Sequence, residues 1–349
     1  MNTVIGWDIG GVNTKATLII FRDGTIVQQK VASQYFEIWQ NREALIEVLR
    51  KLAEKLGSAE AMGVTMTAEL SDAFRNKREG VSFILTCLEE AFPNVPLYVL
   101  DVSGKFVGVE TAGQNPIQVA ASNWTASALL VSQMYPNCLF VDIGTTSTDI
   151  IPIINGQIAT RGRNDLTRLQ AGELVYMGAL RTNINTIVPA IPVNGSFCRT
   201  AAEYFAIIGD VHLILGNLSK QQYALDTPDR REKSREFALE RLARLVCADT
   251  ELLQEEEIVN MARYIQEKQI QLLTEAVLQV LSRFPKGNQL PMVTTGLGEF
   301  LAKKCAGRIG LETISLEDQF GKAASIAAPS FAVALAFIEK VRGEITRYD

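Results

Sequence analysis

The sequence predicts an α/β protein of two domains, each built on a sheet that begins with the same hairpin. The chain has 349 residues, which is longer than a domain with a single hydrophobic core usually is. Short strand-like apolar runs alternate with amphipathic helical segments along the chain. The hairpin sequence DIGGVNT at residues 8–14 recurs in register as DIGTTST at residues 142–148, which indicates an internal repeat.

The first half alternates strands and helices in a regular order. Three strands are expected within residues 4–9, 14–20 and 21–31, with Asp23-Gly24 as a hairpin turn. A helix should follow over residues 41–57, where leucine and valine recur at helical spacing and Gly57 ends the pattern. A strand at 61–70, a helix at 81–92 and a strand at 96–102 complete this half.

The second half opens with the repeat and continues with helices. Three strands joined by tight turns are expected within residues 138–144, 148–156 and 157–163. Residues 229–284 are too long for one uncapped helix, so two or more are expected. A strand, a glycine turn and a helix should span 290–305, and a last helix should run from Pro329 to about Arg342.

Composition excludes several classes of function. The balance of 34 basic against 39 acidic residues gives a net charge of -5, which offers no broad positive field for nucleic acid. No segment reaches 18 uninterrupted apolar residues, and the N-terminus lacks a basic leader, so no membrane association is expected. Five scattered cysteines favour reduced thiols and a cytoplasmic protein.

The repeated hairpin suggests a site for a phosphate chain. A glycine in a tight turn lets backbone N–H groups approach an anion, and neighbouring hydroxyls add donors. The aspartate needs Mg2+ or water between itself and a phosphate. A single Asp-x-Gly is more often only a turn, but two copies in register favour a clamp in which both turns face one ligand across a cleft.

The two hairpins and the late Gly296-Leu297-Gly298 turn resemble the superfamily of actin, sugar kinases and the Hsp70 ATPase. This resemblance implies a two-domain, actin-like ATPase (ribonuclease H-like) fold with duplicated mixed sheets and a central cleft. The first domain would comprise residues 1–135 and 322–349. The second would comprise residues 136–321 and carry a helical insertion.

Longer strings narrow the resemblance. Residues 63–72 (GVTMTAELSD), 119–128, 176–183 and 203–215 resemble the hydantoinase/oxoprolinase branch. Residues 226–230 (DTPDR), 241–253 and 320–334 resemble the enzymes of tetrahydromethanopterin biosynthesis that join an aminomethylfuran diphosphate to γ-glutamyltyramine. The resemblance implies a transferase in which the phenol oxygen replaces diphosphate on the furan methylene, so that its partners are small molecules. The aspartate of each turn, facing a diphosphate, predicts Mg2+ as cofactor.

Two other classes of function stay open from the sequence. One is an ATP-dependent small-molecule kinase or a hydantoinase/oxoprolinase-like enzyme, and the other is a non-enzymatic actin-like module switched by nucleotide. The adenosine loop of ATP-using relatives generally has adjacent glycines, whereas Gly296 and Gly298 are separated, so diphosphate is favoured over ATP or ADP. A homodimer is also left open.

The candidate site residues follow from the repeat and the resemblance. The catalytic candidates are Asp8, Asp142, Asp149 and Glu69, of which Asp8 and Asp142 are also the metal candidates. The candidates for binding phosphate or cofactor are Gly10, Gly11, Thr14, Lys15, Gly144, Thr145, Thr146, Gly296 and Gly298.

Several of the candidates have a structural alternative. Lys15 and Asp149 could be ordinary polar residues of a strand, and Glu69 could belong to a helix cap. Arginines 161, 163, 168 and 181 could hold the diphosphate or the glutamyl tail, although most exposed arginines have no such role. Trp124 could stack on an aromatic substrate or be buried, and the single histidine, His212, is expected in the core.

Overall fold

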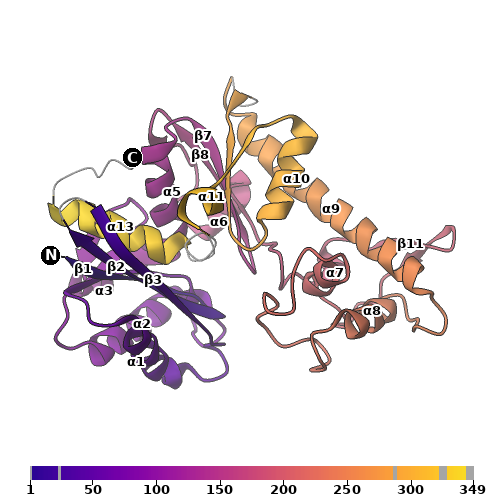
Figure 1. The fold of residues 1–349 in the computed structure, drawn as a ribbon, viewed down its shortest axis with the longest axis horizontal. Coiled ribbons are helices and arrows are strands. Elements are labelled where there is room, and N and C mark those ends of the chain that lie inside the picture. The colour runs from indigo at the N-terminus through magenta and orange to yellow at the C-terminus, as the bar shows by residue number, and fades with distance from the viewer. Residues whose placement is uncertain (1, 23–24, 286–288, 322–327, 343–349) are drawn as a thin grey trace. The chain divides into compact units, whose positions relative to one another are not determined.

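The structure is a computed structural model that describes residues 2–22, 25–285, 289–321 and 328–342 (Figure 1). By their contacts, residues 1–137, 153–167 and those from 316 onward form one compact unit. Residues 138–152 and 168–315 form a second. We call these the first and the second unit. The domain boundaries expected at 135/136 and 321/322 stay predictions, and the Asp23-Gly24 turn lies outside the described residues.

The described secondary structure alternates strands and helices, as the sequence predicts. The strands are β1 Thr3–Ile9, β2 Asn13–Arg22, β3 Thr25–Tyr35, β4 Ala61–Met66, β5 Leu97–Leu100, β6 Phe106–Gly108, β7 Cys138–Ile143, β8 Thr148–Ile154, β9 Gln157–Ile158, β10 Leu174–Val175, β11 Ala190–Val193, β12 Ser196–Arg199, β13 Met292–Thr295 and β14 Thr313–Ser315. The helices are α1 Leu45–Leu56, α2 Lys77–Ala91, α3 Val109–Gln114, α4 Pro116–Val119, α5 Asn123–Met134, α6 Asp165–Ala171, α7 Ile208–Ile214, α8 Arg235–Arg244, α9 Glu255–Leu281, α10 Glu299–Ile309, α11 Leu316–Phe320 and α13 Ala328–Arg342. Three short 3-10 helices are η1 Arg42–Ala44, η2 Ala68–Leu70 and η3 Ile184–Thr186.

The first unit is a mixed sheet between two layers of helices. Its strand order is β3-β2-β1-β4-β5-β6, in which β1, β4 and β5 are parallel and the other pairs are antiparallel. One apolar cluster joins the sheet to α1 and α2. A second joins it to α5 and α13, and Figure 1 shows α13 lying across the strands.

The second unit repeats this strand order. Its main sheet runs β10-β8-β7-β13-β14, so that β7, β8 and β13 take the places of β1, β2 and β4. As in the first unit, the strand that ends in the repeated aspartate lies parallel to the strand that follows it in the sheet, here β13. The predicted actin-like α/β class with duplicated mixed sheets is therefore confirmed. The central cleft stays a prediction.

One strand of the second sheet was assigned wrongly from the sequence. Residues 157–163 were expected to form the third strand, but only the two residues of β9 do so, at the end of β8. The place beside β8 is taken by β10, which pairs Leu174 with Asp149 and Val175 with Thr148. The reason is that α6 intervenes before the chain returns to the sheet, and local sequence does not reveal such a return.

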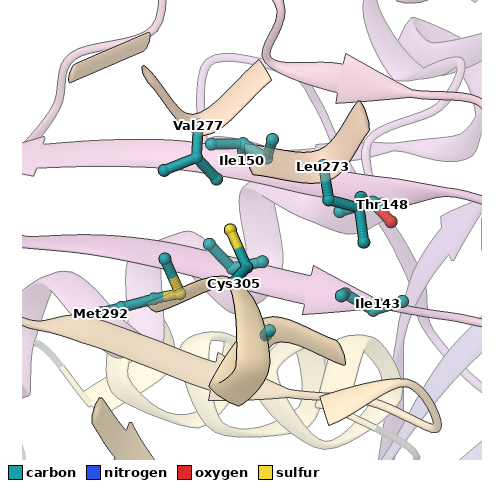
Figure 2. A pocket seen from close by; sticks show the side chains of 9 residues that line it. Ile143, Thr148, Ile150, Leu273, Val277, Met292 and Cys305 are labelled. Carbon is teal, nitrogen blue, oxygen red and sulfur yellow. The ribbon is translucent and has the colours of Figure 1, made fainter. Parts of the chain in front are cut away.

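The core of the second unit lies between its sheet and the helices α9 and α10. Side chains of β7, β8 and β13 meet Leu273, Val277 and Cys305 there, as Figure 2 shows. The space among them is too small for a water molecule, since its volume is about 0 Å³. This seam is therefore packed core, and it holds the first strand of the repeat in place.

None of the helices within residues 2–22, 25–285, 289–321 and 328–342 has the length and apolar character needed to cross a membrane.

We expect Gly6→Ala to loosen the packing of α13 on the first sheet. A methyl group at Gly6 would stand 2.0 Å from the carbonyl oxygen of Ser330 and 2.7 Å from the amide nitrogen of Ala334, so helix and strand would have to separate. Overpacking of this kind costs roughly 1–3 kcal/mol. Urea unfolding followed by tryptophan fluorescence measures it, because all three tryptophans lie within residues 1–137 of the first unit.

Gly113→Ala in α3 is the matched control. A methyl group at this position meets no heavy atom within 4 Å, so we expect unchanged or slightly higher stability. Equal unfolding midpoints for Gly6→Ala and the wild type would show that α13 does not require the close approach.

Candidate functional site

The first turn of the repeat lies at the carboxyl end of β1. The amide of Gly10 donates to the carbonyl oxygen of Asn13 at 3.1 Å and closes the turn. A side chain at Gly10 would stand 2.6 Å from that oxygen, so only glycine fits. The amides of Gly11 and Val12 donate to no other group in the described part of the chain. The turn thus offers two backbone donors to a ligand.

Asp8 lies beside this turn, and a lysine on the neighbouring strand lies opposite it. In the register of β1 and β2 it lies opposite Lys15, so both side chains project from the same face of the sheet. In the parallel register of β1 and β4 it lies beside Thr65. Asp8 is nearly buried, and Thr14, which follows the turn, is fully buried. Lys15 is therefore better placed than Thr14 to reach a ligand.

The end of β4 packs against the same turn and leads to Glu69. The amide of Thr67 donates to the carbonyl oxygen of Ile9 at 2.9 Å, and the Thr67 hydroxyl lies 3.6 Å from where a side chain at Gly10 would begin. Glu69 follows in η2. Gly80 of α2 lies so close that a methyl group on it would be 2.3 Å from the carbonyl oxygen of Glu69. Helix α2 therefore covers Glu69.

Glu69 is a buried carboxyl group with an incomplete set of partners. The residue is 1% exposed, and neither carboxyl oxygen has a hydrogen bond within the described residues. The Lys77 ammonium lies 3.6 Å away and also contacts Asp165 at 2.5 Å. Burial raises the pKa of Glu69 to about 7, although the charge of Lys77 acts in the opposite direction. This carboxyl group can therefore exchange a proton near neutral pH.

The second turn has the same closure and gains a supporting segment. The amide of Gly144 donates to the carbonyl oxygen of Ser147 at 2.9 Å, while the amides of Thr145 and Thr146 donate to no group in the described ranges. The amides of Leu180 and Arg181 donate to the carbonyl oxygen of Thr145 at 3.1 and 2.9 Å. This segment fixes the turn from outside.

Gly178 allows this segment to lie close to the second turn, and the same segment carries Arg181. A methyl group on Gly178 would stand 2.6 Å from the amide nitrogen of Thr146. Three residues later, the Arg181 guanidinium reaches the Thr146 hydroxyl at 3.5 Å. Two amides, two hydroxyls and one guanidinium thus gather at the second turn, and such groups bind phosphate oxygens.

The glycines after β13 pack against the end of β7. Gly296 has a φ of +92°, and a side chain on it would lie 2.5 Å from a carboxylate oxygen of Asp142. The amide of Gly298 donates to the carbonyl oxygen of Ile143 at 2.8 Å. The close packing of this turn accounts for both glycines without a nucleotide. Their role in binding a cofactor stays a prediction.

Asp149 is held by a buried arginine. Its carboxylate forms an ion pair with the Arg168 guanidinium at 2.9 Å, and both side chains are almost completely buried. Arg168 also donates to the carbonyl oxygen of Glu173 at 3.0 Å. This arrangement favours a structural role for Asp149 and Arg168 over catalysis or ligand binding.

The remaining candidates divide between core and surface. Trp124 is buried at the start of α5, which favours packing over substrate stacking. His212 is fully buried, and its Nε2 lies 2.9 Å from the amide oxygen of Gln269. Burial lowers the pKa of His212 to about 3, so it stays neutral. Arg161 and Arg163 are exposed.

A second feature of the repeat was missed in the sequence. Thr65 lies near the end of β4 and Glu69 follows four residues later, as Thr295 ends β13 and Glu299 follows four residues later. Thr295 lies beside Asp142 in the sheet register as Thr65 lies beside Asp8. Glu299, unlike Glu69, accepts a hydrogen bond from the Thr294 hydroxyl at 2.7 Å. Aligning the two T-x-x-x-E strings would have revealed this extension.

The donor set is compatible with magnesium bound together with a phosphate ligand. Within the described ranges, no three acidic, histidine or cysteine side chains gather so as to hold a metal by themselves. Each turn brings one aspartate, Asp8 or Asp142. Mg2+ typically uses one or two carboxylates and takes its other ligands from water and phosphate oxygens.

Comparison with known proteins places the chain in a family. Residues 60–340 match the hydantoinase/oxoprolinase family, and the chain belongs to it. Its relatives include a protein of Methanocaldococcus jannaschii named (4-{4-[2-(gamma-L-glutamylamino)ethyl]phenoxymethyl}furan-2-yl)methanamine synthase. The two sequences are 38% identical over 332 residues, which cover 95% of this chain and 96% of that protein. The synthase of the same name from Methanococcus vannielii is 33% identical over 60% of this chain and 95% of its own length.

These matches confirm the resemblance found in the sequence strings. Among solved structures, the ethanolamine utilization protein EutJ from Carboxydothermus hydrogenoformans aligns with a TM-score of 0.47 and 13% identity, covering 96% of this chain and 89% of that one. The activator of 2-hydroxyisocaproyl-CoA dehydratase from Clostridium difficile aligns with a TM-score of 0.46 and 13% identity, covering 99% of both chains.

We expect Glu69 to make the first unit less stable as pH rises. Its folded pKa of about 7 lies above the ordinary value of 4.5, so the folded state binds the proton more tightly. The stability due to this proton is fully present below pH 4.5 and is lost as pH rises through 7. The loss should total about 3 kcal/mol, at 1.36 kcal/mol per pKa unit. Urea unfolding at pH 5 and pH 8, followed by tryptophan fluorescence, measures it.

Glu69→Gln should remove this part of the pH dependence. Glu54→Gln, which changes an exposed carboxylate of α1 in the same unit, should retain it. The same difference between pH 5 and pH 8 in wild type and Glu69→Gln would contradict the raised pKa.

Proposed function

We propose that the protein is a synthase that joins the phenol of γ-glutamyltyramine to the methylene carbon of an aminomethylfuran diphosphate, in tetrahydromethanopterin biosynthesis. The observation that carries this proposal is the 38% identity, over nearly the full length of both chains, to the synthase whose name states this ether product. The two repeated turns support it, because the backbone amides that they leave available suit a diphosphate group.

The proposed reaction is a substitution at carbon. The phenol oxygen forms a bond to the furan methylene carbon while the bond from that carbon to the diphosphate oxygen breaks. Diphosphate leaves with the bonding electron pair, and the phenol proton passes to the protein. The furan ring can stabilise positive charge on the methylene carbon, so departure of diphosphate is the step that most needs assistance.

The turns would assist departure by binding the diphosphate oxygens. In the second turn the amides of Thr145 and Thr146 and the guanidinium of Arg181 are the donors. In the first turn they are the amides of Gly11 and Val12. Asp142 beside the second turn and Asp8 beside the first are the carboxylates proposed for Mg2+. When bound, this ion neutralises part of the charge that develops on the leaving group.

The pair of Glu69 and Lys77 would accept the phenol proton. Glu69 is fully enclosed, whereas the Lys77 side chain is 19% exposed and contacts Glu69 at 3.6 Å. Lys77 can take the phenol proton as it gives one of its own to Glu69, so the net acceptor is the carboxylate. A base whose pKa lies near neutral is suited to this task.

The glycine turn after β13 supports diphosphate over ATP. Gly296 packs on Asp142, and the amide of Gly298 is bonded to Ile143, so the packing of β7 already accounts for this turn. A kinase or a nucleotide-switched module would in addition need a site for adenine.

We expect the purified protein with Mg2+ to form the ether and release diphosphate without nucleotide. Asp142→Asn and Arg181→Ala should each lower kcat/KM by at least about tenfold, because the first removes a carboxylate proposed to hold Mg2+ and the second removes a cation that would bind the leaving group. Glu256→Gln, an exposed carboxylate of α9, should not change it. Mass spectrometry of the ether and an enzymatic diphosphate assay measure both products.

Titration calorimetry with diphosphate, ADP and ATP in the presence of Mg2+ separates this proposal from its alternatives. Similar affinity for ADP and diphosphate is expected, since the adenosine should contribute nothing. Strong preference for ATP together with ATP-dependent turnover would overturn the proposal.

We expect Glu69→Gln to lower kcat by about 10²–10⁴-fold, the usual range for loss of a general base. The wild-type rate should rise with pH through about 7 as Glu69 loses its proton, and the variant should lack this limb. Glu54→Gln serves as the control for an exposed carboxylate in the same unit. Retention of the limb in Glu69→Gln would assign the base elsewhere.

A further inference from the structure

The second unit contains a charged cavity outside both turns. It has a volume of about 310 Å³ and is lined by residues 220, 226–227 and 230–233, in the loop between α7 and α8. Ligand pockets begin at roughly this size, about 300 Å³. The lining includes four basic and two acidic side chains. No step of the proposed reaction uses them.

Half of these charged groups are committed to partners within the protein. Lys220 pairs with Glu232. Arg231 pairs with Asp229 at 2.8 Å and with Glu240 at 2.7 Å. The side chains of Asp226, Arg230 and Lys233, in contrast, make no ion pair or hydrogen bond with the described residues. The cavity therefore has two uncommitted cations and one uncommitted carboxylate.

The loop that presents these groups is fixed from beneath. The buried Arg241 binds Asp229 at 3.2 Å and the buried Asp210 at 2.7 Å. The Thr227 hydroxyl donates to the carbonyl oxygen of Arg231 at 2.7 Å, and the amide of Arg230 donates to Thr227. The uncommitted charges are thus displayed on a supported frame, as a binding site requires.

Two cations and one carboxylate match an α-amino acid better than a phosphate. The product named for the relatives carries a γ-L-glutamyl group, whose α-carbon bears both a carboxylate and an ammonium. The carboxylate suits Arg230 and Lys233, and the ammonium suits Asp226. A diphosphate would be repelled by Asp226, and a simple amine would leave both cations unpaired.

We propose that this cavity binds the α-amino-acid end of the γ-glutamyl group of the phenolic substrate. The inference rests on the proposed function, because that function supplies the γ-glutamyl group. Arg230 and Lys233 contact the carboxylate, and Asp226 contacts the ammonium. The cavity thereby distinguishes γ-glutamyltyramine from a phenol that lacks the glutamyl group.

Titration calorimetry with γ-glutamyltyramine and with N-acetyltyramine, whose nitrogen is likewise an uncharged amide, tests the site directly. We expect N-acetyltyramine to bind the wild type at least about tenfold more weakly, because it lacks both charged groups of the amino acid end. Arg230→Ala, Lys233→Ala and Asp226→Asn should each weaken the binding of γ-glutamyltyramine by about tenfold and leave the binding of N-acetyltyramine unchanged. Lys304→Ala, which removes an exposed lysine of α10 in the same unit, should change neither.

The Asp226→Asn variant separates an amino acid from an anion. Loss of this carboxylate weakens a ligand that bears an ammonium, but it strengthens a ligand that is only an anion. Tighter binding of γ-glutamyltyramine to Asp226→Asn, or unchanged binding to Arg230→Ala, would overturn the proposal. Displacement of γ-glutamyltyramine by inorganic diphosphate in the absence of Mg2+, with loss of that displacement in Arg230→Ala, would also overturn it.

Kinetics separates failure of this proposal from failure of the proposed function. If the wild type forms the ether and Arg230→Ala has unchanged KM for γ-glutamyltyramine, the cavity assignment is wrong and the synthase stands. If the wild type forms no ether but binds γ-glutamyltyramine through Arg230 and Asp226, the synthase is wrong and the amino acid site stands.

Discussion

The hydrogen bond that closes each repeated turn is the constraint on which the site depends. A glycine amide donates to the carbonyl oxygen three residues later, in the first turn from Gly10 and in the second from Gly144. This closure turns the next two amides away from the sheet ladder and leaves them available to an anion. It also fixes where the aspartate two residues before the glycine must stand, since that residue is held in the parallel register between β1 and β4 or between β7 and β13.

Both copies of the repeat keep this turn, but the charged side chains around it have different partners in the two units. In the first unit Asp8 lies across from Lys15, whereas the repeat places Asp149 at the position that corresponds to Lys15, and Arg168 pairs with it. The carboxyl groups after the next strand differ as well. Glu299 accepts a hydrogen bond from Thr294, whereas Glu69 is buried with the Lys77 ammonium 3.6 Å away. Burial without full compensation is costly, and groups of this kind are common at functional sites. The carboxyl group with the less complete set of partners is therefore that of the first unit.

Particular residues show how far sequence reasoning reached. The order and type of most helices and strands could be predicted, because apolar periodicity is a local signal. In α1, for example, the buried residues form the predicted apolar stripe. The contact of Arg181 with Thr146 was not readable, because 35 residues separate them and only the glycine at 178 lets the segments meet. Helix α2 begins at Lys77, before the predicted start at residue 81. Its first turn is polar and is capped by the side chain of Asn76, so the apolar pattern begins only later.

The sequence by itself determined the duplicated hairpin, the α/β class and the family, because these depend on patterns and strings within single segments. Tertiary structure alone decided which charges meet. The buried pair of Asp149 and Arg168, the enclosure of Glu69 under Gly80, and the cavity around Arg230 and Asp226 arise from packing between elements. Burial and partner choice set the energy of a charge, and both are properties of the folded chain that no local pattern contains.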